Sequence, residues 1–274
     1  MNTILVPTDF SDSSGKTLDY ALFIASKLKA KVILFNVYPV QKGNSGQLLA
    51  ELELVRVCKE VREQNSITIS YSCTPGKGAT EILREAIKVN ADLIIMGATG
   101  ASDVKRMILG SNAYNVINTA KIPVIAVPNK NRKKTIKEIV LAVGAYSPEI
   151  ETLKKIGQFA AAFDAGIVIT HVSTNRKDPL CVDTKKIIDL TGYKNISCEV
   201  LIGKNIVQEM NHFLINENAS MLVMVRKDKP FMKSIIGADL SRNITFTNNI
   251  PLLVFHESLL GNSLSEINPS EILG

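Results

Sequence analysis

The segment from residue 97 to residue 111 has the composition of a phosphate-binding loop. Its glycines and serine follow the spacing Gly-x2-Gly-x9-Gly-Ser, at Gly97, Gly100, Gly110 and Ser111. Glycine has no Cβ, so backbone N–H groups at these positions can approach a phosphate chain closely. Gly110 and Ser111 are placed to open a helix, whose free N–H groups and partial positive charge suit an anion. The alternative is that the glycines only serve tight turns.

Two other positions have the chemistry to recognise a base or a sugar. Asp9 follows the apolar run Ile-Leu-Val-Pro of residues 4–7, and its carboxylate could accept hydrogen bonds from adenine or ribose donors. Val37 ends a second apolar run, where its backbone could bond to an adenine edge. For Asp9 the alternative is a turn residue or a helix cap.

Apolar runs alternate with helical patterns along the first half of the chain. The runs predict strands at residues 4–7, 31–37, 67–72, 92–96 and 123–127. Apolar residues at helical spacing predict a first helix that is capped by Ser11 or Ser13 and extends to Leu28. Further helices are predicted over residues 48–63, 79–87 and 111–120, with residues 43–46 in a loop. This order predicts a parallel sheet with helices on both faces and ligands beyond the carboxyl ends of its strands.

The second half of the chain repeats the first. Residues 139–143 match residues 4–8 at an offset of 135, and residues 219–224 match residues 91–96 at an offset of 128. The expected fold is therefore α/β, with two tandem doubly wound domains that each contain a five-stranded parallel sheet and flanking helices. We expect domains at residues 1–128 and 138–256, a linker at 129–137 and a loosely held tail at 257–274.

Composition excludes several classes of protein. The 274 residues are 46% apolar and 21% charged, as in ordinary globular proteins, and no apolar run is long enough to cross a bilayer. The net charge of +6 is divided evenly between the halves, so no nucleic-acid partner is expected. The four cysteines form no Cys-x-x-Cys pair, and a metal site is not expected. With no secretory pattern at its start, the protein is expected in the cytoplasm.

The chain resembles universal stress proteins of the tandem type. The resemblance rests on the sequence Ile-Leu-Val-Pro-Thr-Asp-Phe-Ser at residues 4–11 and on the glycine loop, and it covers about residues 1–256. It points to the ATP-binding branch of that family and implies an adenine-nucleotide-hydrolase-like fold, with ATP as ligand and Mg²⁺ as an optional companion. Asp9 and Val37 would then hold adenine or its ribose in a pocket lined by Pro7, Thr8 and Met96, while Gly97, Gly100, Gly110, Ser111 and Asn112 would hold ribose and phosphates.

The second half departs from this pattern. Gly144 stands where the first half has Asp9, and the sequence Val-Arg-Lys-Asp of residues 225–228 replaces that of residues 97–100. We therefore expect the second domain to bind no nucleotide. Because family members pair in dimers, its expected role is to pair with the first domain by antiparallel contact between residues 124–127 and 252–255. Association of whole chains into a homodimer remains open.

No catalytic residue can be assigned from the sequence. A P-loop and a Gly-x-Ser-x-Gly motif are absent, and Ser111 has no recognisable His–Asp partner. At most, slow ATP hydrolysis is expected. The favoured function is that of a stress-response regulatory protein that binds ATP in its first domain. A nucleotide-independent interaction or scaffold protein is the alternative, and a nucleotidyl-transfer enzyme is less favoured.

Overall fold

One ten-stranded sheet runs through the computed structural model, which describes residues 1–98, 109–131, 134–144, 148–173, 184–227 and 249–257. Its strand order is β3-β2-β1-β4-β5-β10-β9-β6-β7-β8. The strands are β1 (Thr3–Thr8), β2 (Lys31–Tyr38), β3 (Ile69–Pro75), β4 (Leu93–Gly97), β5 (Val124–Val127), β6 (Glu138–Ala142), β7 (Gly166–Ser173), β8 (Ile196–Ile202), β9 (Met221–Lys227) and β10 (Leu252–Glu257). The α/β fold predicted from the sequence is confirmed.

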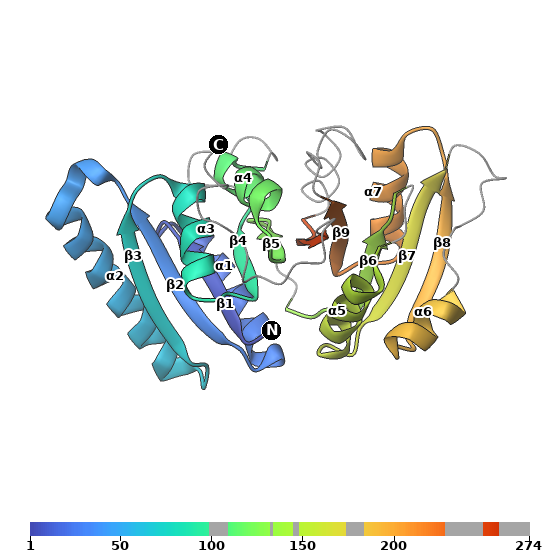
Figure 1. Ribbon diagram of the computed structural model, residues 1–274, viewed down its shortest axis with the longest axis horizontal. Coiled ribbons are helices and arrows are strands. Elements are labelled where there is room, and N and C mark those ends of the chain that lie inside the picture. Colours follow the sequence, from blue (N-terminus) through green and yellow to red (C-terminus); the bar gives the residue numbers. More distant parts are fainter. Residues whose placement is uncertain (99–108, 132–133, 145–147, 174–183, 228–248, 258–274) are drawn as a thin grey trace.

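Helices cover both faces of the sheet (Figure 1). They are α1 (Asp12–Leu28), α2 (Gly43–Gln64), α3 (Gly78–Lys88), α4 (Ser111–Thr119), α5 (Ile150–Ala161), α6 (Thr184–Thr191) and α7 (Ile206–Asn216), with a short 3-10 helix η1 (Val40–Lys42). One buried apolar cluster takes its helical residues from α1, α2, α5 and α6, and the other takes them from α3, α4 and α7. Alternation along the central strands supplies both clusters, as in β4, where Leu93 and Ile95 face one side while Ile94 and Met96 face the other.

The two halves of the sheet meet at the one antiparallel pairing among the described strands. Within each half all pairings are parallel. At the seam, β5 and β10 run antiparallel, with Ile125 opposite Leu253. Both side chains are fully buried, and each of the two apolar clusters includes residues from both sides of the seam. The seam therefore joins two similar half-sheets through hydrogen bonds and through continuous cores.

The local sequence determines where helix α1 begins and ends. Ser11 caps the helix, because its hydroxyl accepts a hydrogen bond from the backbone N–H of Ser14 at 3.3 Å. Seven buried residues, from Thr17 to Ala25, then hold the helix against the sheet. The helix ends where Lys29 adopts the left-handed conformation with φ of 55°.

Two boundaries expected from the sequence are wrong. Residues 43–46 are not a loop, because α2 already begins at Gly43. Gly46 is buried in its first turns, where a Cβ would lie 2.6 Å from the Cβ of Lys42, so the glycine marks close packing and no break. Strand β3 covers Ile69–Pro75, beyond the expected end at residue 72. Proline is tolerated there because β3 lies at the edge of the sheet.

No helix among the described residues is long and apolar enough to span a membrane.

We predict that Leu253→Ala at the seam lowers the free energy of unfolding by about 2–5 kcal/mol, because it leaves a cavity in a buried core. Urea denaturation measures the loss. The matched control is Leu49→Ala on α2, where the leucine is 59% exposed and the expected change is within about 0.5 kcal/mol. Equal effects of the two substitutions would contradict the assignment of Leu253 to a tightly packed core.

Candidate functional site

A pocket of about 240 Å³ lies at the carboxyl ends of β1, β2 and β4. The strand order reverses between β1 and β4, and this is where parallel α/β sheets usually bind ligands. Nine of the ten predicted site residues line the pocket, namely Pro7, Thr8, Asp9, Val37, Met96, Gly97, Gly110, Ser111 and Asn112. The tenth, Gly100, lies outside the described residues.

Asp9 sits in a tight, hydrogen-bonded turn between β1 and α1. Its carboxylate accepts hydrogen bonds from the backbone N–H of Ser11 at 3.1 Å and from the Ser11 hydroxyl at 2.5 Å. The next residue, Phe10, has a φ of 61°, which is rare for a bulky side chain, and its N–H bonds to the hydroxyl oxygen of Thr8. These hydrogen bonds hold the backbone turn at Asp9, and the side chain of Asp9 stays exposed at the pocket.

The same contacts keep Asp9 ionised. Partial burial raises the pKa of the carboxyl group, but the hydrogen bonds from Ser11 and Ser14 favour the charged form, so the pKa lies below its ordinary value. At neutral pH the pocket therefore presents a carboxylate that accepts hydrogen bonds, as the amino and hydroxyl donors of a nucleoside require.

Val37 and Met96 line the pocket at the ends of β2 and β4. Pairing between β1 and β2 ends at Thr8 and Asn36, and the Asn36 amide donates to the Thr8 carbonyl at 2.8 Å. The N–H of Lys31 donates to the carbonyl of Asn2 just before β1, whereas the carbonyl of Tyr38 accepts from the N–H of Gly76 just after β3. The backbone groups of successive strand residues point to alternate sides, so those of Val37 point toward β1. The Val37 carbonyl consequently faces the pocket just beyond the last paired residue of β1.

The start of α4 forms the other wall. The N–H of Gly110 donates to the carbonyl of Ala98 at 2.8 Å, and the N–H of Ala98 donates to Val127 at 2.9 Å. These bonds bring the first residues of α4 next to Gly97 at the end of β4. Ser111 and Asn112 are exposed in the first helical turn, where backbone N–H groups have no partner within the helix. This wall can therefore donate hydrogen bonds to an anion.

Several pocket residues were missed in the sequence. The polar ones are Ser11, Ser13 and Ser14, and the others are Phe35, Gly78, Ile82, Ala98 and Ala113. Gly78 had a signal, since it is the second glycine of the sequence Pro-Gly-Lys-Gly at residues 75–78, where α3 begins. A Cβ on Gly78 would lie 2.4 Å from the side-chain oxygen of Asn112, so the glycine allows α3 and α4 to approach at the pocket.

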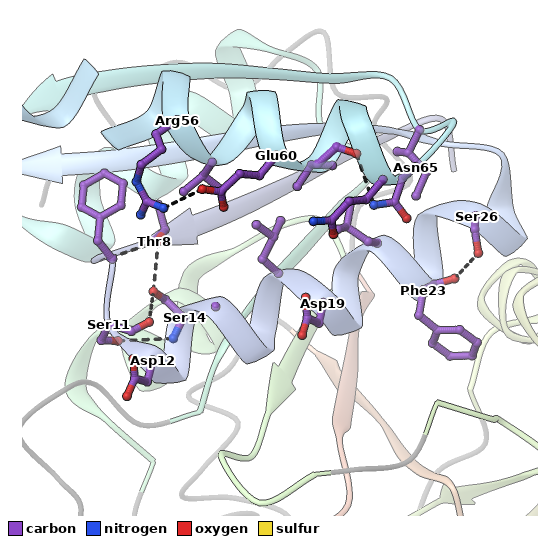
Figure 2. A pocket seen from close by; sticks show the side chains of 18 of the residues that line it. Thr8, Ser11, Asp12, Ser14, Asp19, Phe23, Ser26, Arg56, Glu60 and Asn65 are labelled. Atoms are coloured by element: carbon purple, nitrogen blue, oxygen red, sulfur yellow. Dashed lines mark hydrogen bonds and ion pairs between the residues drawn. The ribbon is translucent and has the colours of Figure 1, made fainter. Parts of the chain in front are cut away.

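A second, larger cavity of about 600 Å³ lies between α1 and α2 and shares Thr8, Ser11 and Ser14 with the pocket. Figure 2 shows Arg56 and Glu60 of α2 across from α1, joined by an ion pair of 2.8 Å. Its lining includes the carboxylates of Asp12, Asp19 and Glu60, with Arg56 and Lys134 as the cations. Among the described residues, Thr8 is the one predicted site residue that lines this larger cavity.

The second half keeps one side-chain contact that the first half makes at the end of its second strand, but it differs at the position of Gly97. His171 replaces Asn36, and its Nδ1 lies 3.1 Å from the carbonyl of Val143, which corresponds to Thr8. This histidine therefore has a structural partner. Val225 corresponds to Gly97 in strand register and is 6% exposed, so it places a side chain where the first half has none. Asp228 lies outside the described residues.

We predict that Ser11→Ala raises the pKa of Asp9, because it removes the hydroxyl that stabilises the carboxylate. A carboxyl-carbon NMR titration measures the change. The substitution also removes the helix cap and should cost about 1 kcal/mol of stability. Ser26→Ala on the same helix, where the hydroxyl bonds only to the Phe23 carbonyl among the described contacts, should leave the pKa of Asp9 unchanged. An unchanged or lower pKa in Ser11→Ala would contradict the assigned role of Ser11.

Comparison with known proteins matches the sequence of the first half to one family. Residues 1–128 match the universal stress protein family. A universal stress protein from Methanocaldococcus jannaschii is 33% identical over 142 residues, which cover 47% of this chain and 84% of the relative. The universal stress protein YxiE of Bacillus subtilis is 26% identical over 145 residues, which cover 46% of this chain and 98% of the relative.

The likeness of fold extends over nearly the whole chain. The crystal structure of a universal stress protein from Archaeoglobus fulgidus superimposes with a TM-score of 0.75 at 22% identity, covering 93% of this chain and 98% of that one. At this identity the match shows the fold, while the sequence relatives show the family. The chain belongs to the universal stress protein family.

Proposed function

We propose that this universal stress protein binds ATP in the pocket at the carboxyl ends of β1, β2 and β4 and acts as a stress-response regulator. The observation that carries the proposal is the bond from the Gly110 N–H to the Ala98 carbonyl, because it brings the start of α4 into the same pocket as Asp9. The pocket then offers a carboxylate for nucleoside donors at one wall and helix N–H groups for phosphates at the other.

The residues divide by chemistry within this proposal. Asp9 and the Val37 carbonyl would hold adenine or ribose, with Pro7, Thr8 and Met96 around them. The phosphate side would consist of Gly97, Gly110, Ser111 and Asn112, and Gly100 joins them on its sequence position alone. Mg²⁺ would enter as the counter-ion of the triphosphate. No residue is assigned as a base, so hydrolysis is at most slow.

The proposal gives the halves different roles. We propose residues 1–128 as the nucleotide-binding domain, 138–256 as a second domain that binds no nucleotide, 129–137 as the linker and 257–274 as the tail. Gly144 and the buried Val225 replace the carboxylate and the glycine of the first half. The second domain would serve as the pairing partner of the first, which the antiparallel pairing of β5 with β10 supports.

Calorimetric titration of nucleotide-stripped protein tests the ligand. We predict a stoichiometry of about one ATP per chain, with weaker binding of GTP because the Val37 carbonyl could accept a hydrogen bond from the 6-amino group of adenine but would face the 6-oxygen of guanine. ADP and AMP serve as comparisons for the phosphate side. About two ATP per chain would contradict the proposed loss of binding in the second half, and no binding at millimolar ATP would overturn the proposal in favour of a nucleotide-independent interaction protein.

We predict that Asp9→Ala lowers the affinity for ATP by about 10- to 100-fold, as expected when a charged hydrogen-bond acceptor is removed. The matched control is Asp19→Ala, an exposed aspartate on α1 that faces the larger cavity, and it should bind ATP as the unmodified protein does. Equal affinities in both variants would contradict the role of Asp9. Thermal melting of both variants confirms that each is folded.

A further inference from the structure

The far end of α4 is held by a side chain from the other half of the molecule. Arg226 on β9 is 5% exposed, and its Nη2 donates a hydrogen bond of 2.6 Å to the carbonyl of Ala120, which caps the carboxyl end of α4. The two residues are 106 positions apart in the sequence. In Figure 1, α4 and β9 lie on opposite sides of the seam between β5 and β10.

Strand geometry explains how Arg226 reaches α4. Along β9, Leu222 and Met224 belong to the apolar cluster that contains α3, α4 and α7. Side chains two residues apart point to the same face of a sheet, so Arg226 points to this face as well. A buried guanidinium is stable only with hydrogen-bond partners, and the Ala120 carbonyl provides one at the end of a helix.

The residue that corresponds to Arg226 in the first half is Ala98. Ile94 pairs with Val124 as Leu222 pairs with Leu252, which makes positions 98 and 226 equivalent in register. Ala98 is fully buried, and its carbonyl holds Gly110 at the start of α4. In the second half, residues 225–228 stand where the first half has its glycine pattern. The same short segment thus supplies the Arg226 guanidinium, which reaches across the seam.

We infer that Arg226 is a positioning residue through which the second half holds α4 and thereby tunes phosphate binding in the first half. The inference rests on the proposed function for its effect on affinity. Helix α4 has nine residues and is about 14 Å long, so its two ends are fixed by separate contacts, Ala98 with Gly110 at one end and Arg226 with Ala120 at the other. A cation at the carboxyl end of a helix also offsets the partial negative charge there and stabilises the last turn.

The effect should be confined to the phosphate side of the ligand. Asp9 and Val37 belong to β1, β2 and the turn that follows β1, whereas the Arg226 guanidinium donates to the carbonyl at the end of α4. Loss of Arg226 should therefore weaken ATP binding and leave adenosine binding nearly unchanged. A general loss of folding would weaken both.

The test combines hydrogen exchange with titrations of ATP and adenosine on the full chain. For Arg226→Met we predict that the amides of residues 113–119 exchange about tenfold faster without nucleotide, that ATP affinity falls about tenfold, and that adenosine affinity stays within about twofold. Arg226→Lys keeps the charge, so it should show smaller changes in amide exchange and in ATP affinity than Arg226→Met. The matched control is Arg62→Met, which removes a 2.8 Å bond from a guanidinium to the carbonyl of Ile69, away from α4, and should change none of these values.

Unchanged exchange in α4 of Arg226→Met would overturn the inference even if ATP binds. An equal loss of ATP and adenosine affinity would overturn it too, because Arg226 would then support folding in general. If the unmodified protein binds no ATP, the proposed function fails and the effect on affinity fails with it, whereas the exchange rates still decide whether Arg226 holds α4.

Discussion

The antiparallel pairing of β5 with β10 is the contact on which the rest of the structure depends. Each half-sheet alone would expose an apolar strand at this edge, and such an edge readily joins another strand. Here the two edges satisfy each other within one chain, with Ile125 and Leu253 fully buried between them. Helices from both halves then pack over common cores on the two faces. Helix α4, whose first residues line the pocket, lies beside this seam and packs in a core shared by both halves.

Most of the fold could be predicted from the sequence because buried parallel strands are continuous apolar runs. Residues 31–37 and 92–96 coincide closely with β2 and β4 for this reason. The start of α2 could not be predicted, since Gly46 looks like a break until the close approach of Lys42 is seen. The end of β3 was also missed, because a proline is compatible with a strand only at an edge, and edges are set by tertiary structure.

The candidate site was predictable to a similar degree. Parallel strands end at one edge of the sheet, so residues that follow different strands, such as Asp9 and Gly97, come together around one pocket. Gly78 was missed because its role depends on the approach of α3 to Asn112. Arg226 was missed for a stronger reason: a contact between residues 106 positions apart leaves no local pattern in the sequence.

The fusion of two half-sheets in one chain has a consequence for how the seam can change over evolutionary time. In a symmetric dimer of identical chains, every substitution at the shared interface occurs twice, once on each side of the axis. In the fused chain each side varies independently. Position 226 can carry a long cation while position 98 keeps a small alanine, and each fits its own surroundings. Covalent linkage thus permits two similar halves to diverge in what their side chains do, as Ala98 and Arg226 have at equivalent positions of the two half-sheets.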